Sequence, residues 1–470
     1  DFFYARKRLV FEEFFLMQLA LFTLKNRISK KKSPIQIEKY DLSDSFTKTL
    51  PFTLTSDQVK SIEEIKKDFK SGYPMHRLLQ GDVGSGKTVV ALYAVMCIFQ
   101  NGYQSAFMAP TEILALQHYY TALSLLGKFG VNIVLLTGHM KKHEKEEILH
   151  KIENHEADLV IGTHAIFQED VVFKKLALCI TDEQHRFGVQ QRSLFSAKSV
   201  MPHLLVMSAT PIPRTLALIL YGDLDISTIK ELPENRKKVL TYSVDESYRT
   251  RINEFILKIV SKKEQAFIVC PSIYENEVLD ITNVISKYQQ IQSDIPSLRI
   301  AMLHGEMKKN EKNEILKKYK NNEISVLVTT SIIEVGIDIP NATLMIIEDA
   351  QQFGLSQLHQ LRGRVGRSDK QSYCVLFNQS KSDISKKRLD VLVKSNDGFY
   401  ISEQDLILRG PGDFFGTKQH GLPEFKIANI YDDMDILKLA QKAVKEEIRD
   451  NNVYRQLLGN GLDYLSKANL

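Results

Sequence analysis

Residues 77–88 read RLLQGDVGSGKT, and this stretch decides how the surrounding chain folds. An apolar run at residues 77–80 ends in a glycine-rich loop, and a helical pattern follows to about residue 100. The loop fits the pattern GxxxxGK[ST], whose glycines let backbone N–H groups face phosphate oxygens. A strand, a phosphate-binding loop and a helix in this order predict an α/β domain that binds a nucleotide outside the carboxyl end of the strand.

Each position of this loop has an expected part in nucleotide binding. Lys87 would reach the β and γ phosphates, and the Thr88 hydroxyl would hold Mg²⁺. An ordinary glycine-rich turn would leave the strand and helix around it unexplained, and a chance match has a probability on the order of 1 to 2%. We therefore expect ATP and Mg²⁺ as cofactors, with the nucleotide held by Gly81, Asp82, Val83, Gly84, Ser85, Gly86, Lys87 and Thr88.

Short apolar runs alternate with helical patterns from about residue 50 onward, which is the signature of a parallel sheet covered by helices. The runs occupy residues 77–80, 105–109, 132–136, 158–162, 177–181 and 204–207, and a second series lies near Val239 and at residues 266–270, 299–303, 325–329, 344–347 and 373–377. Pro233-Glu234-Asn235-Arg236 between the two series is typical of a linker. The pattern predicts two α/β domains, at residues 51–232 and 233–395, after a linker helix in 1–50 and before a tail in 396–470.

An acidic pair, Asp182 and Glu183, directly follows the run at residues 177–181. An acid at this edge of a sheet can hold Mg²⁺, and its neighbour can orient and deprotonate the attacking water. Taken alone, an acidic pair after a strand is more often a solvated loop or a helix cap. The phosphate loop upstream reverses that preference, so we assign Asp182 to the metal and Glu183 to the water.

Two arginines of the second domain, Arg364 and Arg367, are spaced to lie on one side of a helical turn. Guanidinium forks suit the spread charge of a phosphoryl-transfer transition state. A solvated or DNA-phosphate-binding arginine cluster is the competing interpretation. Because only the first domain has a phosphate loop, we expect the second domain to contribute these arginines to catalysis.

Composition alone does not identify a partner, since 62 Lys and Arg residues against 57 Asp and Glu give a net charge of only +5. The four cysteines, Cys97, Cys179, Cys270 and Cys374, lie far apart in apolar runs and indicate reduced core thiols of a cytosolic protein. The most apolar stretch, residues 14–24, is shorter than the roughly 20 residues needed to cross a bilayer. We expect no membrane role.

Several segments resemble, in order, the motifs of superfamily 2 helicases. They are the phosphate loop, Ala109-Pro110-Thr111-Glu112, Gly162-Thr163-His164, Asp182-Glu183-Gln184-His185, Ser208-Ala209-Thr210, His304-Gly305, residues 329–338 and the arginine run. The resemblance spans residues 52–367 and implies two tandem RecA-like domains with the ATPase site in the cleft between them. It is closer still to the RecG family, through DEQHRFGVQQ (182–191), MSATPIPRTL (207–216), IIEVGIDIPNA (332–342) and SQLHQLRGRVGR (356–367).

The tail at residues 397–425 is similar to the translocation motif that the RecG family shares with the transcription-repair coupling factor. That motif forms a helical hairpin, which couples the arginine-bearing helix to movement on duplex DNA. Here Lys418 stands where the motif is expected to have Arg, which keeps the charge but loses the planar fork.

The resemblance also implies roles for single residues. The adenine-recognition segment corresponds to Phe52 and Gln58, and nucleotide contacts from the second domain correspond to Gly336, Asp338 and Gln360. Coupling of hydrolysis to movement is implied for Gln184, His185, Ser208, Thr210 and Arg409. Loops that hold the nucleic-acid backbone correspond to Thr111, Gly138, Thr163, His304 and Thr329. For each of these single residues, an ordinary turn or strand-end polar group is a serious competing interpretation.

The function implied is that of an ATP-dependent DNA helicase or translocase that moves on double-stranded DNA and remodels stalled replication forks and branched recombination intermediates. We expect a monomeric, cytoplasmic, nucleoid-associated bacterial protein. RecG proteins carry a wedge domain before the motor, and this chain opens at Asp1 into a helical pattern, so we expect the wedge to be missing. Two alternatives stay open: an RNA helicase, which the core motifs alone would permit, and a binding scaffold without hydrolysis.

Overall fold

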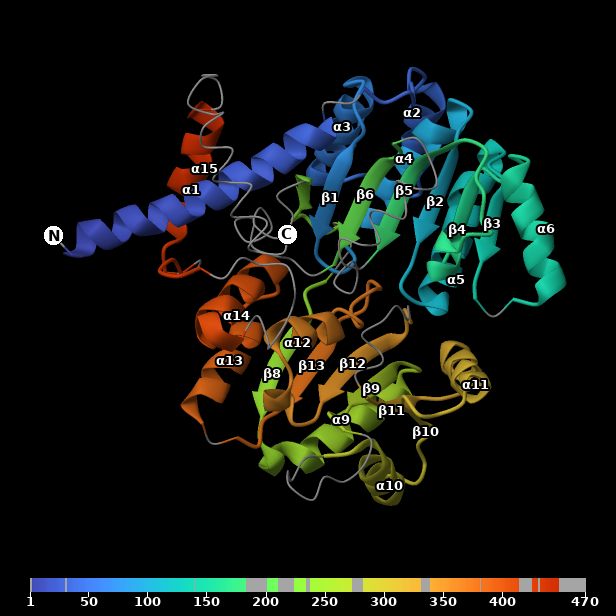
Figure 1. The fold of residues 1–470 in the computed structure, drawn as a ribbon. Coiled ribbons are helices and arrows are strands. Elements are labelled where there is room, and N and C mark those ends of the chain that lie inside the picture. Colours follow the sequence, from blue (N-terminus) through green and yellow to red (C-terminus); the bar gives the residue numbers. More distant parts are fainter. Residues whose placement is uncertain are drawn as a thin grey trace. The chain divides into compact units, whose positions relative to one another are not determined.

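The computed structural model describes residues 2–29, 32–138, 140–182, 201–209, 224–233, 237–272, 282–330, 339–380, 382–413, 425–429 and 432–447. The chain divides into two compact units: Asp1–Gly81, Gly86–Glu231 and Leu406–Leu470 form the first, and Asp82–Ser85 and Leu232–Asp405 form the second. Each unit has its own sheet (Figure 1). The predicted α/β class, with two parallel sheets flanked by helices and a helix at the amino terminus, is confirmed. The finer division at residues 50, 232 and 395 stays a prediction.

The first unit is built on a seven-stranded parallel sheet in the order β3-β4-β2-β5-β6-β1-β7. Its strands are β1 (His76–Gly81), β2 (Gln104–Met108), β3 (Ile133–Leu136), β4 (Leu159–Gly162), β5 (Leu176–Asp182), β6 (His203–Ser208) and β7 (Asp225–Ile229). Its helices are α1 (Phe2–Ser29), α2 (Asp41–Lys48), α3 (Ser56–Lys70), α4 (Lys87–Gln100), α5 (Glu112–Leu126), α6 (Lys142–Glu153) and α15 (Met434–Glu447), with short 3₁₀ turns at Gly127–Phe129 and His164–Phe167.

Successive strand residues of this sheet enter two different hydrophobic cores. Leu79 packs in the core with α3 and α4, whereas its neighbour Leu78 packs in the core with α1 and α6. On β2, Phe107 packs in the first of these cores and its neighbour Ala106 packs in the second. Because side chains alternate across a strand, a sheet covered on both faces needs apolar residues at nearly every position. The continuous apolar runs of the sequence follow from this burial.

The second unit has a six-stranded parallel sheet in the order β10-β11-β9-β12-β13-β8. Its strands are β8 (Leu240–Val244), β9 (Gln265–Val269), β10 (Ile300–Leu303), β11 (Val326–Thr329), β12 (Ala342–Ile347) and β13 (Tyr373–Phe377). The helices are α9 (Arg249–Ser261), α10 (Val284–Asp294), α11 (Lys309–Lys320), α12 (Leu355–Arg362) and α13 (Asp383–Lys394), with 3₁₀ turns at Glu246–Tyr248 and Ala350–Gln352. The boundary between the units, at Asp405 and Leu406, falls inside α14 (Gly398–Asp413). Residues of α9 and α10 pack with β9, β11 and β12 in one core.

The four cysteines are buried and free, and burial raises the pKa of Cys97 to about 11 and that of Cys374 to about 12. These thiols are therefore protonated at neutral pH. Of the helices in the described part of the chain, none is long and apolar enough to cross a membrane.

Candidate active site

The phosphate loop connects β1 to α4 and depends on two glycines with left-handed backbone angles. Gly84 has φ of 76° and Gly86 has φ of 82°. A Cβ at Gly86 would lie 2.2 Å from Nε2 of Gln58, so a side chain there would be strained by both backbone and contact. Lys87 is buried, and its Nζ donates a hydrogen bond to the Gly81 carbonyl at 2.8 Å across the loop. Lys87 thus connects the two ends of the phosphate loop, in which it is expected to bind phosphate.

The amino terminus of α4 suits a bound phosphate. Gly86 occupies the N-cap and makes no side-chain cap hydrogen bond, so no side chain of the cap covers the first N–H groups. Such groups, together with the helix dipole, favour an anion. Thr88 is the second residue of α4 and directly follows Lys87. The chain's own residues therefore fit the phosphates of ATP.

Gln58 of α3 lies next to Gly86 of the phosphate loop. It forms a capping box with Thr55: the Gln58 Oε1 accepts from the Thr55 N–H at 2.9 Å, and the Thr55 Oγ1 accepts from the Gln58 N–H at 3.3 Å. Gln58 is buried, whereas Phe52 is 45% exposed. The structure brings the expected adenine-side glutamine to the phosphate loop and leaves the phenylalanine accessible.

Asp182 ends β5, two strands from β1, and its side chain is buried. Between them, β6 pairs with both strands, with Ser208 opposite Gln80 and Met207 opposite Asp182. The carboxyl ends that carry Asp182, Ser208 and the phosphate loop therefore lie side by side. The roles assigned to Glu183, Gln184, His185 and Thr210 fall outside the described residues.

The expected DNA-backbone residues of the first unit also gather at strand ends. Thr111 is the N-cap of α5, and its Oγ1 accepts from the Leu114 N–H at 3.3 Å. Thr163 follows β4, and Gly138 lies beyond β3, with open space where a Cβ would be. Since β2, β3 and β4 are neighbours, these three residues share one edge of the sheet.

In the second unit, Thr329 ends β11 and is fully buried, and its Oγ1 donates to the Thr330 carbonyl at 3.0 Å. His304 follows the neighbouring β10, and its Nδ1 is buried without a hydrogen bond to any described residue. The positions expected to contact nucleotide and DNA at Gly336 and Asp338 lie outside the described residues. Arg409 lies on α14, and its side chain is not among those described.

The arginines Arg364 and Arg367 follow α12 instead of lying on a helical turn, which corrects the sequence interpretation. The helix carries Gln360 and ends at Arg362, and Gly366 between the two arginines has φ of 74°. Right-handed helix cannot continue through such an angle. A Cβ at Gly366 would lie 2.8 Å from the Val239 side chain, so this position requires glycine.

Arg362 has a structural role that sequence reasoning missed. Its Nη1 donates to the carbonyls of Leu392 at 2.7 Å and Ser395 at 2.9 Å, and its Nη2 lies 3.0 Å from Nδ1 of His359. It is buried, and the bonds tie the end of α12 to the end of α13. Arg364 is also buried, whereas Arg367 donates from Nε to the Gly363 carbonyl at 3.2 Å. These contacts fix the backbone that carries Arg364 and Arg367.

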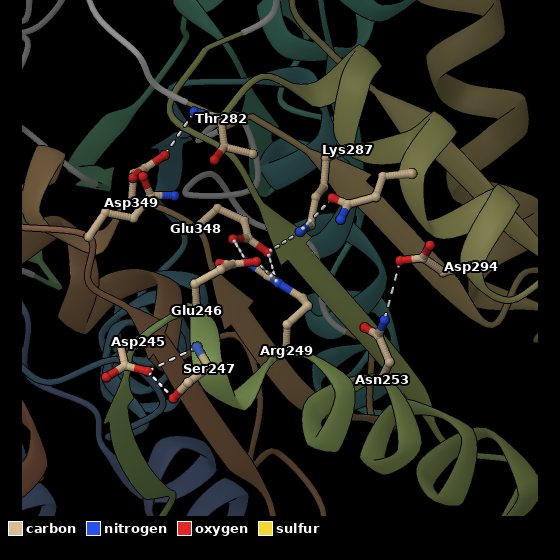
Figure 2. A network of polar contacts seen from close by, with 12 residues as sticks. Asp245, Glu246, Ser247, Arg249, Asn253, Thr282, Lys287, Asp294, Glu348 and Asp349 are labelled. Atoms are coloured by element: carbon tan, nitrogen blue, oxygen red, sulfur yellow. Dashed lines mark hydrogen bonds and ion pairs between the residues drawn. The ribbon is translucent and has the colours of Figure 1, made fainter.

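A buried ion network at the end of β12 was also missed, and Figure 2 shows its members. Glu348 is fully buried and accepts two hydrogen bonds from Arg249, at 2.7 and 2.8 Å, and an ion pair from Lys287 at 3.0 Å. Arg249 also binds Glu246. Burial lowers the pKa of Arg249, but the bonds to Glu246 and Glu348 outweigh it and raise this pKa above its ordinary value.

The network also fixes Asp349, which has a left-handed backbone with φ of 46°. Its Oδ2 accepts from the Thr282 N–H at 2.7 Å, just before α10. The network joins α9 and α10 to the carboxyl edge of the sheet, where β9, β11 and β12 end. Its sequence separation, such as 99 residues between Arg249 and Glu348, hides it from motif reading.

Three family models match successive parts of the chain. The DEAD/DEAH box helicase model matches residues 55–219, and the helicase conserved C-terminal domain matches residues 250–369. The model of ATP-dependent DNA helicase RecG, domain 3, C-terminal, matches residues 395–463. With the phosphate loop and the two parallel-sheet units, these matches define an ATP-hydrolysing helicase of superfamily 2.

Individual relatives identify the family within this class. The chain is 46% identical to the ATP-dependent DNA helicase RecG of Staphylococcus aureus, covering 96% of this chain and 67% of the relative. It is also 46% identical to RecG of Synechocystis, covering 94% of this chain and 53% of that relative. The chain belongs to the RecG family of ATP-dependent DNA helicases. It spans between about half and two thirds of the length of these relatives.

A solved structure of RecG bound to a three-way DNA junction matches with a TM-score of 0.75 and 42% identity, over 93% of this chain and 57% of that chain. The helicase MrfA, solved with DNA and AMPPNP, shares the fold at a TM-score of 0.56 and 16% identity.

Proposed function

We propose that this chain is the motor of a helicase that moves on double-stranded DNA and remodels stalled replication forks and branched recombination intermediates. The observation that carries the proposal is the similarity to RecG bound to a three-way junction. The match of residues 395–463 to a RecG-specific model supports the same substrate, because general helicase domains do not include this tail. An RNA substrate has no comparable support.

The proposed catalytic roles combine residues at the carboxyl edge of the first sheet with two arginines of the second unit. Lys87 binds the β and γ phosphates, and Thr88 and Asp182 hold Mg²⁺, which supplies charge neutralisation at the transferred phosphoryl group. Glu183 orients and deprotonates water, and Arg364 and Arg367 stabilise the transition-state charge. Asp182 and the loop share an edge across β6, which supports the roles proposed for Asp182 and Lys87.

Movement is proposed to follow from alternating grip on the DNA backbone. Thr111, Gly138 and Thr163 hold one segment of backbone, and His304 and Thr329 support the hold of the second unit. Ser208, Thr210, Gln184 and His185 link hydrolysis to this movement, and Arg409 on α14 transmits it to duplex DNA. We propose that the protein acts as a monomer in the cytoplasm, on nucleoid DNA; the bacterial origin of its RecG relatives supports the cytoplasmic location.

The test compares ATP hydrolysis stimulated by a three-way junction, plain duplex, single-stranded DNA and RNA. We expect the junction and the duplex to stimulate hydrolysis most. Lys87→Ala should lower the DNA-stimulated rate by at least about 100-fold, because it removes a phosphate contact made in the transition state. Lys142→Ala, which changes a 92% exposed lysine on α6, should hydrolyse ATP normally.

Stimulation by RNA alone would contradict the proposed substrate. Normal hydrolysis in a folded Lys87→Ala variant would instead contradict the assigned ATPase site. A wild-type chain that binds junctions without releasing phosphate would leave only the binding scaffold.

A further inference from the structure

His118 is a buried histidine of α5 that no motif in the sequence singles out. Its Nε2 lies 2.9 Å from Oδ2 of Asp182, the carboxylate assigned to Mg²⁺. Since an ionised carboxylate can only accept, Nε2 is the donor of this hydrogen bond. Oδ1 of Asp182 makes no hydrogen bond to the residues that the structure describes. One oxygen is therefore held by the histidine while the other is left for a ligand.

The histidine ring is itself held in place by the sheet. It lies against Phe107 of β2, with ring centroids 4.5 Å apart and an interplanar angle of 31°. The strand β2 pairs with β5, placing Met108 opposite Thr181, the residue before Asp182. The imidazole thus spans from one strand to the end of the next. Both the ring and the carboxylate are about nine-tenths buried, so water competes poorly for this bond.

We propose that His118 is a positioning residue that fixes the Asp182 carboxylate in the orientation that takes the Mg²⁺ of bound ATP. The inference rests on the proposed assignment of Asp182 to the metal. Partners of this kind, which hydrogen-bond a metal ligand without touching the metal, set the orientation and basicity of the ligand. His118 sets the orientation of the Asp182 carboxylate in the same way, by donating a hydrogen bond from Nε2–H.

The position of His118 on α5 adds a link to DNA. Thr111, proposed to hold the DNA backbone, is the N-cap of the same helix, and His118 lies two turns further along, roughly 10 Å by helix geometry. A rigid helix therefore joins the DNA-holding loop to the carboxylate that holds the metal. A displacement of α5 would therefore also move the hydrogen-bond donor of Asp182.

A buried histidine elsewhere in the same unit shows the ordinary structural alternative. His203 on β6 lies 4.8 Å from the Phe69 ring, and its Nδ1 accepts from the Met75 N–H at 2.9 Å. Both histidines pack on a phenylalanine. His203 hydrogen-bonds a backbone N–H, whereas His118 hydrogen-bonds a carboxylate at the candidate active site. His203 is therefore the matched control for loss of a buried imidazole.

The experiment measures how much Mg²⁺ is needed for tight binding of a fluorescent ATP analogue by the full chain. His118→Phe keeps a ring against Phe107 and removes the donor. We expect its half-saturating Mg²⁺ concentration to rise about 10- to 100-fold, the usual range for loss of such a partner. Binding of the analogue without Mg²⁺ should stay within about twofold of wild type. His203→Phe should leave the Mg²⁺ dependence unchanged.

Two further variants keep the result decisive. His118→Gln can still place an N–H near Asp182 and should restore most of the Mg²⁺ response, whereas the shorter His118→Asn should not. This comparison stands even if His118→Phe fails to fold. Equal Mg²⁺ dependence in the Gln and Asn variants, or a His118→Phe curve that superimposes on wild type, would overturn the inference.

The Asp182→Asn variant distinguishes the role of His118 from the assignment of Asp182 to Mg²⁺. If Asp182→Asn leaves the Mg²⁺ dependence unchanged, the metal assignment fails and the inference fails with it. If Asp182→Asn weakens the Mg²⁺ response and His118→Phe does not, only the role of His118 is refuted.

Discussion

Burial of a single side chain, His203, makes the stability of the first unit depend on pH. Burial, with a smaller contribution from His76, lowers the pKa of His203 from 6.5 to about 4. Between those values the unfolded chain binds a proton that the folded chain excludes, so stability falls as pH falls. Above about pH 7 the imidazole is neutral in both the folded and the unfolded state, so it no longer lowers the free energy of unfolding.

We expect the free energy of unfolding of wild type to fall by up to about 1.4 kcal/mol for each pH unit between 6.5 and 4 through this residue. His203→Gln keeps an acceptor for the Met75 N–H but does not titrate, so its stability should change less over that range. Urea unfolding of both proteins at pH 5, 6, 7 and 8 measures the difference. Parallel pH curves for the two proteins would contradict this account.

At the residue scale, the sequence predicts sites whose residues are consecutive in the chain. The phosphate loop could be placed because its glycines, Lys87 and Thr88 are consecutive and follow a strand. The partner of Asp182 could not be predicted, because His118 is 64 residues away and reaches it only through the pairing of β2 with β5. Motif spacing carries no information on such a contact.

At the scale of elements, α1 binds the segment that returns from the tail region. The Glu13 carboxylate accepts hydrogen bonds from three consecutive backbone N–H groups, those of Lys426, Ile427 and Ala428, at 3.0, 3.2 and 2.8 Å. Further along the segment, Arg6 binds Asp433 through two bonds at 2.7 and 2.8 Å. The helix and the segment are held by charge-assisted bonds that span more than 400 residues of sequence.

Glu13→Ala should expose the three amides of residues 426–428. Hydrogen bonds to charged groups contribute about 1.5–3 kcal/mol each when buried, and this partly exposed site should lose about 1 kcal/mol in all. Hydrogen exchange should therefore quicken about fivefold at these amides and remain unchanged in β1 to β6. Glu12→Ala, at an exposed position of the same helix, is the control. Unchanged exchange at residues 426–428 would contradict the role of Glu13 in holding the segment.

Strand prediction succeeded where the strand sequence is apolar, which includes the edge strands β3 and β10, and it missed β7. The strand β7 reads DISTI, lies at the edge of the sheet and has only two buried residues, so its sequence resembles a loop. The turn with Arg364 and Arg367 was wrongly predicted as helix because spacing alone does not show that α12 ends at Arg362 or that Gly366 has a left-handed backbone. The hydrophobic pattern therefore reports neither a strand with a polar sequence, such as β7, nor the residue at which a helix ends.

For the whole molecule, two units with separate sheets and separate cores imply unfolding that is not a single two-state transition. ATP binding should stabilise the unit that contains Lys87 and Asp182, because a ligand of the folded state shifts its unfolding equilibrium. At a concentration 100 times its Kd, a non-hydrolysable ATP analogue with Mg²⁺ contributes about 2.7 kcal/mol.

For a unit of this size, that contribution should raise the midpoint of its thermal transition by about 5 to 10 °C. Differential scanning calorimetry with and without the analogue measures the shift, and Lys87→Ala should abolish most of it while Lys142→Ala should not. Because each unit has its own core, we expect the analogue to shift one transition more than the other. An equal shift of both transitions would mean that the two units unfold together, and a normal shift in Lys87→Ala would remove the lysine from the binding site.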